Sequence, residues 1–175
     1  PGAVGVDAEH SQANILVAAP IHYQTFLDSP VSPSRLPQLQ LAISSGAPLS
    51  APVAHHFCQQ HHTGILELYG STETGGIAYR RWDNVGQPPA FALFPYIEIA
   101  PDSASGELIV ASPAISQNIR PTADDPWYAT GDIVTFVSGG DKIFNIVGRD
   151  SHIIKAGGKR ISASQLEEDL KKIPQ

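Results

Sequence analysis

The chain has 175 residues, 42% of them hydrophobic, with a formal net charge of −6, one cysteine and no methionine. Such a composition is typical of a folded globular protein of one domain or slightly more. The acidic balance argues against nucleic acid or an anionic membrane as partner, no apolar run is long enough to cross a bilayer, and the single cysteine excludes an internal disulfide framework and favours a reducing, cytoplasmic location.

Residues 1–84 alternate between predicted strands and predicted helices. Short apolar runs bounded by proline, glycine or small residues predict strands at 14–20, 39–43 and 65–70. Helices are predicted at 21–29 and 50–62, the second capped by Ser50 and ended by Gly64. This alternation predicts an α/β fold with a parallel sheet, in which ligands bind at the carboxyl ends of the strands.

The sequence pattern differs in residues 85–148. Short segments of alternating apolar and polar residues are separated there by glycine, proline, serine and aspartate. They predict a small antiparallel β-barrel subdomain, with a hairpin turn at Ser138–Lys142. Residues 149–175 predict a hairpin at 152–161 and a helix opened by a capping box at Ser162–Gln165, the start of an α+β C-terminal domain. We therefore expect three pieces with junctions near 84 and 150, and a chain that is part of a longer protein.

Three polar motifs are candidates for chemistry. In "LYGSTETGG" (68–76), hydroxyls and backbone N–H groups suit phosphate, and Glu73 suits Mg²⁺, but a polar turn after a strand explains the loop equally well. Asp132 in "YATGDI" can accept hydrogen bonds from ribose hydroxyls, or it can be a hairpin aspartate that bonds its own backbone. In "GRDSHIIKAGG", Arg149 and Lys155 share one face of an extended strand, which a solvated surface hairpin also explains.

Five motifs, "SSGAPLS", "LYGSTETGG", "VGQP", "YATGDI" and "VGRDSHIIKAGGKRISASQLEE", occur in this order from about Ile15 to the last residue. Together they resemble the adenylate-forming superfamily of acyl-CoA synthetases, luciferases and the adenylation domains of peptide synthetases. The resemblance is closest to a carboxylic acid–CoA ligase. Departures are small: Ser151 replaces the usual aspartate or lysine, and "SQNIR" replaces a Gly-Tyr pair in the β-barrel.

The resemblance implies a nucleotide site. The small-residue loop would line the adenine through its backbone, and Tyr69 would stack on the base. Thr72 would contact the α-phosphate, Glu73 would ligate Mg²⁺, and Asp132 would bind the ribose hydroxyls with Arg149 beside it. The implied nucleotide-binding residues are Gly46, Ala47, Pro48, Tyr69, Gly70, Ser71, Thr72, Asp132 and Arg149.

The acyl pocket and the thioester step are implied in the same way. Gly75 and Gly76 would form part of the acyl-pocket wall, and His22 would line that pocket unless it is only a histidine at a helix start. Ser151 falls at the family's hinge between domains. The implied catalytic residues are Thr72, Glu73 and Lys155, and the loop bordering the pantetheine tunnel is Gly157 and Gly158.

The implied reaction uses ATP and Mg²⁺. A small-molecule carboxylic acid attacks the α-phosphorus to give an acyl-adenylate and pyrophosphate, and the thiol of CoA, or of phosphopantetheine on an acyl carrier protein, then takes the acyl group. The loop for the outer phosphates and the adenylation lysine lie outside these 175 residues, so the isolated chain is expected to be inactive.

Two other functions stay open. An amino-acid adenylation domain would place an aspartate early in the first helical region, and only Asp28 lies near it, at the far end. A non-catalytic nucleotide-binding or scaffolding relative would have no need of Thr72, Glu73, Asp132 and Arg149 together. A zinc site from His55, Cys58 and His62 is a further alternative, but the helix "AHHFCQQHH" also carries an apolar stripe that explains the spacing.

Overall fold

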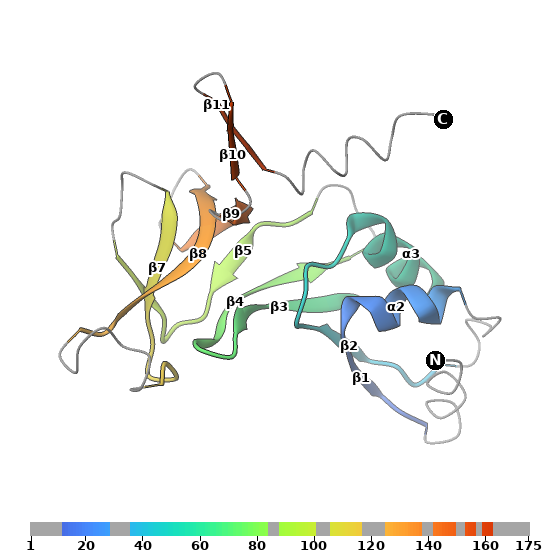
Figure 1. Ribbon diagram of the computed structural model, residues 1–175. Helices are drawn as coiled ribbons and strands as arrows, with labels where there is room; N and C mark the ends of the chain where they lie inside the picture. The colour runs from blue at the N-terminus through green and yellow to red at the C-terminus, as the bar shows by residue number, and fades with distance from the viewer. Residues whose placement is uncertain are drawn as a thin grey trace. The chain divides into compact units, whose positions relative to one another are not determined.

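The computed structural model describes residues 12–28, 36–83, 88–100, 106–116, 125–137, 142–149, 153–156 and 159–162, with side chains up to Arg149. By its internal contacts the chain divides into two compact units, 1–72 with 76–91 and 73–75 with 92–175. The structure is a mixed α/β one, with parallel strands and helices in the first unit and antiparallel strands in the second (Figure 1). The predicted junctions near 84 and 150 stay predictions.

The first unit is built on three parallel strands. β1 (Ile15–Ala18), β2 (Leu41–Ser44) and β3 (Ile65–Ser71) lie side by side in that order. Ile15 of β1 is opposite Leu41 of β2, and both strand pairs are parallel. The predicted parallel sheet is therefore confirmed. Because the strands are parallel, the carboxyl ends of β2 and β3 lie at the same edge of the sheet.

Two helices connect these strands and contact each other: α2 (Pro20–Leu27) and α3 (Ala51–His61). Both helices match the predicted segments. Ser50 is the N-cap residue of α3 as expected, although its side chain makes no capping hydrogen bond. α3 ends earlier than predicted, because His62 takes the left-handed conformation (φ 54°) that terminates a helix. Gly64 has a different role, since a Cβ there would lie 2.7 Å from the carbonyl oxygen of Trp82.

The core of the first unit is aromatic. The hydroxyl of Tyr23 on α2 donates to the carbonyl of Ile43 at 2.8 Å, and its ring meets Phe57 of α3 edge to face at 4.9 Å. His61 is 7% exposed, packs against Phe26 and Phe57, and neither of its ring nitrogens has a hydrogen-bond partner. Burial, with the nearby His56 and His62 adding, lowers the pKa of His61 to about 4.

β4 (Gly75–Trp82) is a strand that the sequence patterns did not predict. It follows β3 after a short turn and is its neighbour in the sheet. Ile77, Ala78 and Trp82 are buried, whereas Tyr79 and Arg81 are exposed. The strand therefore extends the sheet of the first unit beyond β3 and places Arg80 and Trp82 next to β3.

The second unit is antiparallel. β5 (Phe91–Leu93) leads into it, and the order of its strands is β9 (Ile143–Arg149), β8 (Trp127–Phe136), β7 (Glu107–Ala111) and β6 (Glu98–Ile99). Antiparallel pairing is thus confirmed for β6, β7, β8 and β9, while closure into a barrel stays a prediction. β10 (Ile153–Ala156) and β11 (Lys159–Ser162) form the expected hairpin. The predicted helix after Ser162, and most of the turn at Ser138–Lys142, lie outside the described residues.

Candidate functional site

The loop after β2 lies at the carboxyl edge of the parallel sheet. Gly46, Ala47 and Pro48 are exposed there. Gly46 has a φ of +92°, and a Cβ at this position would meet no atom within 4 Å. The glycine therefore serves the left-handed backbone conformation rather than a close approach by a neighbour.

The end of β3 reaches the same edge. Tyr69 is half-buried and its ring packs at 5.6 Å on the ring of Phe91, while Gly70 and Ser71 finish the strand. Thr72 and Glu73 are exposed in the turn that follows. The structure thus brings the carboxyl ends of β2 and β3, and with them the predicted adenine and phosphate loops, to one edge.

Glu67 is the centre of a polar network that the sequence analysis missed. Its side chain is 3% exposed, and both of its oxygens are used. Oε1 accepts the backbone N–H of Leu49 at 3.0 Å, whereas Oε2 accepts Nε–H of Arg80 at 2.7 Å and Nε1–H of Trp82 at 2.6 Å. A carboxylate can be buried when it is paired and hydrogen-bonded in this way. The only sequence signal was a charged residue inside an otherwise apolar strand.

Arg80 links this network to the aromatic ring of Tyr69. Its guanidinium carbon lies 4.3 Å from the ring centroid of Phe91 and 4.6 Å from that of Trp82. Phe91 in turn packs on Tyr69. Cation–π contacts of this kind favour one orientation of the arginine plane.

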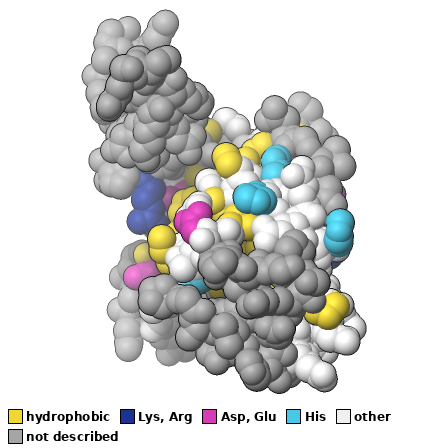
Figure 2. Space-filling view, turned by 90° about the vertical axis from the view of Figure 1, so that its right-hand side faces the viewer, with side chains coloured by type: hydrophobic (Ala, Val, Ile, Leu, Met, Phe, Trp, Pro, Cys, Tyr) yellow, Lys and Arg dark blue, Asp and Glu magenta, His cyan; other side chains and the backbone are white. Residues whose placement is uncertain are grey.

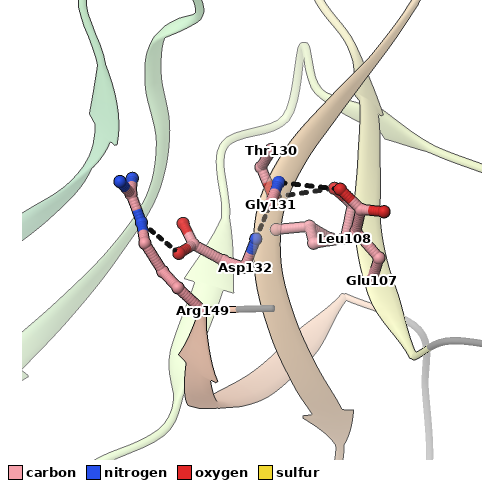
Figure 3. A network of polar contacts seen from close by, with 6 residues as sticks. All are labelled: Glu107, Leu108, Thr130, Gly131, Asp132 and Arg149. Carbon is pink, nitrogen blue, oxygen red and sulfur yellow. Dashed lines mark hydrogen bonds and ion pairs between the residues drawn. The ribbon is translucent and has the colours of Figure 1, made fainter. Parts of the chain in front are cut away.

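In the second unit, Asp132 and Arg149 form an ion pair. The two residues are directly opposite each other on β8 and β9, and Nε of Arg149 lies 2.8 Å from Oδ1 of Asp132 (Figure 3). The Asp132 side chain is 9% exposed and that of Arg149 is 58% exposed. The carboxylate is therefore bonded across the strands, which disfavours the interpretation of Asp132 as a hairpin residue that only bonds its own backbone.

Glu107 supports the irregular stretch of β8 that carries Asp132. Its Oε1 accepts the backbone N–H of Gly131, which has a φ of +75°, at 2.8 Å (Figure 3). In the same stretch of β8, the hydroxyl of Thr130 donates to the carbonyl of Leu108 at 2.8 Å and accepts the N–H of Asp132 at 3.1 Å. The β7–β8 register shifts between Glu107 and Ile109. Sequence reasoning missed Glu107, because its partner is more than twenty residues away.

The predicted acyl-pocket residues have structural contacts of their own. The exposed His22 accepts the N–H of Ala19 at its Nδ1 at 3.2 Å, so it satisfies a donor at the start of α2. Gly75 has a φ of +67°, and a Cβ there would lie 3.1 Å from Cβ of Ala114. Gly76 is half-buried in β4. Whether the three residues line an acyl pocket stays a prediction.

For the thioester step, the structure describes one predicted residue by its backbone. Lys155 lies on β10 opposite Arg160 of β11. Ser151, Gly157 and Gly158 lie outside the described residues. Their roles stay predictions.

The histidine-rich helix places its residues in different surroundings. Cys58 is 1% exposed with its Sγ 3.8 Å from the carbonyl oxygen of Trp82, whereas His62 is exposed. Figure 2 shows histidine side chains at several places on the face that it displays. Over the described ranges, no group of three histidine, cysteine, aspartate or glutamate side chains could hold a metal ion, and no helix is long and apolar enough to span a membrane.

Comparison with known proteins decides the family. The model of the AMP-binding enzyme family matches residues 3–118. The chain belongs to this family. The predicted membership of the adenylate-forming superfamily is therefore confirmed.

Relatives and solved structures agree with this assignment. The chain is 26% identical to a feruloyl-CoA synthase of Amycolatopsis sp, over 97% of this chain and 38% of that protein. It is 34% identical to the long-chain-fatty-acid–CoA ligase FadD15 of Mycobacterium tuberculosis, over 76% of this chain and 23% of the relative. The chain thus spans well under half of these relatives. The amide bond synthetase McbA from Marinactinospora thermotolerans shares the fold, with a TM-score of 0.79, 23% identity and coverage of 98% of this chain and 39% of McbA. ATP-bound MatB from Rhodopseudomonas palustris has a TM-score of 0.76 at 22% identity, over 97% of this chain and 37% of MatB.

Proposed function

We propose that this chain is the part of an ATP-dependent carboxylic acid–CoA ligase that holds the AMP portion of the nucleotide. The observation that carries the proposal is the AMP-binding family match over residues 3–118, made together with relatives named as CoA synthases and CoA ligases. The site geometry supports it, because the loops proposed to hold adenine and phosphate end neighbouring parallel strands.

Each proposed role follows from the chemistry of a side chain. Backbone groups of Gly46–Pro48 border the adenine, and the ring of Tyr69, which packs on Phe91, stacks on the base. Asp132, paired with Arg149, accepts hydrogen bonds from the ribose hydroxyls. The hydroxyl of Thr72 donates to the α-phosphate.

Magnesium fits the same loop. Glu73 is an exposed carboxylate, the hard oxygen ligand that Mg²⁺ prefers, and it directly follows Thr72. When bound, the ion would neutralise phosphate charge as the acid attacks the α-phosphorus. The chain's own contribution is to orient the nucleotide so that the carboxylate oxygen and the leaving pyrophosphate are in line.

The second half-reaction belongs to the same proposal. The thiol of CoA, or of a phosphopantetheine arm on an acyl carrier protein, attacks the acyl carbon and releases AMP. Lys155 and the Gly157–Gly158 loop are proposed to border the thiol's path, and Ser151 is proposed as the hinge. We also propose a cytoplasmic location, in keeping with a single, buried, unpaired cysteine.

An amino-acid substrate is not favoured. The carboxylate of Asp28, the one acidic residue near the first helix, accepts Nε2–H of Gln24 at 3.1 and 3.2 Å and so is engaged at the end of α2. A substrate amino group would therefore have to displace that contact.

The test is ATP–pyrophosphate exchange on the full-length protein with aromatic, medium-chain and hydroxylated acids, followed by thioester formation with CoA and with a carrier protein. We expect exchange and CoA thioester with at least one acid, and loss of both in Asp132→Asn. The matched control is Asp125→Asn, because Asp125 is a carboxylate of the same unit that accepts the N–H of Trp127 and has no proposed ligand role. Exchange with amino acids alone would favour an adenylation domain, and no nucleotide binding at all would refute the proposal.

A further inference from the structure

We propose that Glu67 is a positioning residue that sets the base selectivity of the nucleotide site, an inference that rests on the proposed function. The observation behind it is that one residue of β3 fixes both ends of the loop proposed to border adenine. Ser44, the last residue of β2, lies opposite Glu67 in the parallel register. Leu49, at the other end of the loop, donates its backbone N–H to the Glu67 carboxylate at 3.0 Å.

The position of the loop between Ser44 and Leu49 depends on these two contacts with Glu67. Residues 45–48 are all exposed, so no packing of their side chains fixes their course. Gly46 takes a left-handed conformation with open space around it, and Ser45 is tied to β1 only through a backbone hydrogen bond to Ala18 of 3.3 Å. The position of the exposed backbone groups therefore follows from where Ser44 and Leu49 are fixed.

The second oxygen of Glu67 is connected to Tyr69 through Arg80 and Phe91. Glu67 and Tyr69 are two residues apart on β3 and so face the same side of the strand. Arg80, paired with Oε2, lies over the ring of Phe91, and Phe91 packs on Tyr69. Glu67 is thus joined both to the loop on one side of the proposed adenine position and to the ring on which the base would stack.

If Glu67 only stabilised the fold, its loss would have a different effect on nucleotide affinity. A buried ion pair that only stabilised the unit would need a single contact with Arg80, and its loss would weaken every ligand equally or none. A positioning role instead changes the discrimination between bases, because the loop reads the base while ribose and phosphate are bound by other residues. Selectivity is therefore the readout that separates the two.

The experiment is titration of the full-length protein with AMP and with GMP by calorimetry, in wild type and Glu67→Gln. An amide cannot satisfy all three donors, since whichever end faces Leu49, its NH₂ group confronts either that N–H or Arg80 and Trp82. We expect AMP affinity to fall about tenfold more than GMP affinity, because weaker stacking on Tyr69 affects both bases whereas the loop discriminates between them. Hydrogen exchange of the Ser45–Leu49 amides without nucleotide should rise in the same variant.

Phe57→Leu is the matched control, because it removes buried volume from the core of the same unit without touching Glu67. It should lower the melting temperature and keep the ratio of AMP to GMP affinity. If Glu67→Gln does not fold, the pair Glu67→Gln/Arg80→Gln is compared with Arg80→Gln, so that both charges are absent together.

The outcomes are distinct. If the ratio of AMP affinity to GMP affinity is unchanged in the Glu67 variant, whether both affinities fall equally or neither falls, this inference is overturned and the proposed function is not affected. Wild-type protein that binds neither nucleotide overturns the proposed function and this inference with it.

Discussion

Nε of Arg149 and Oδ1 of Asp132 are 2.8 Å apart on directly opposed positions of two antiparallel strands. The sheet register alone brings the two residues together, so the pair is present before any ligand binds. The arginine is more than half exposed although Asp132 is buried, so solvent screens the pair and it contributes about 1 kcal/mol or less to folding. The pair therefore adds little to the stability of the fold. Its presence is better explained by a ligand that the Asp132 carboxylate binds.

We expect Asp132→Asn to weaken AMP binding about tenfold or more, because an amide replaces an ionised acceptor of the ribose hydroxyls. The melting temperature should change little. The decisive measurement compares AMP with its 2′-deoxy analogue: wild type should prefer AMP, and the variant should not. A variant that keeps the preference would rule out ribose binding by Asp132.

Glu107→Ala should weaken AMP binding without touching the nucleotide. Removing the acceptor of the Gly131 N–H loosens the stretch of β8 that orients Asp132 and costs about 1–2 kcal/mol of stability. Glu107→Gln keeps an oxygen acceptor and should restore both properties. Urea denaturation and AMP titration measure the two effects, and failure of the glutamine variant to restore binding would contradict this role.

Two glycines should respond differently to alanine. At Gly46 the cost is conformational, about 1–2 kcal/mol, because φ is positive and the space is open. At Gly64 the new Cβ would lie 2.7 Å from the Trp82 carbonyl, so β4 must shift and the cost should reach about 2–3 kcal/mol. Chemical denaturation compares them. Gly46→Ala should also alter nucleotide affinity.

His61 should make the protein sensitive to acid. Its pKa in the folded state is about 4, below the ordinary 6.5, so its contribution to stability is complete above about pH 6.5 and declines as the pH falls towards 4. Between about pH 7.5 and pH 5 the free energy of unfolding should fall by about 2 kcal/mol on this account. His61→Leu should flatten the dependence, and His55→Gln is the control, because His55 lies on the same helix but is not among the groups that lower the pKa of His61. An unchanged slope in His61→Leu would show that other groups are responsible.

The parallel strands could be predicted because β1, β2 and β3 are apolar runs bounded by proline, glycine or small residues. β4 could not, since it begins with Gly75 and Gly76 and ends with Arg80, Arg81 and Trp82, a composition typical of a loop. Its burial depends on Glu67, which neutralises Arg80 across the sheet. Local patterns carry no information about such a partner.

The residues of the candidate site also differ in whether they could be predicted from the sequence. Tyr69, Thr72 and Asp132 could be named from short motifs, because glycines and hydroxyls cluster around them in the chain. Glu67 and Glu107 could not, because each is a single acid in an apolar strand whose partners lie 13 to 24 residues away. The residues that contact ligand are thus easier to find in a sequence than the residues that hold them in place.

The fixed ends of the loop after β2 also matter for protein engineering. Ser44 is set by the sheet register and Leu49 by the Glu67 carboxylate, whereas the exposed Ser45–Pro48 segment between them packs into no core. This segment is therefore a replaceable cassette: a library of sequences can be installed between two constant attachment points while the fold is kept. Selection for a different purine would begin there, with Glu67 unchanged.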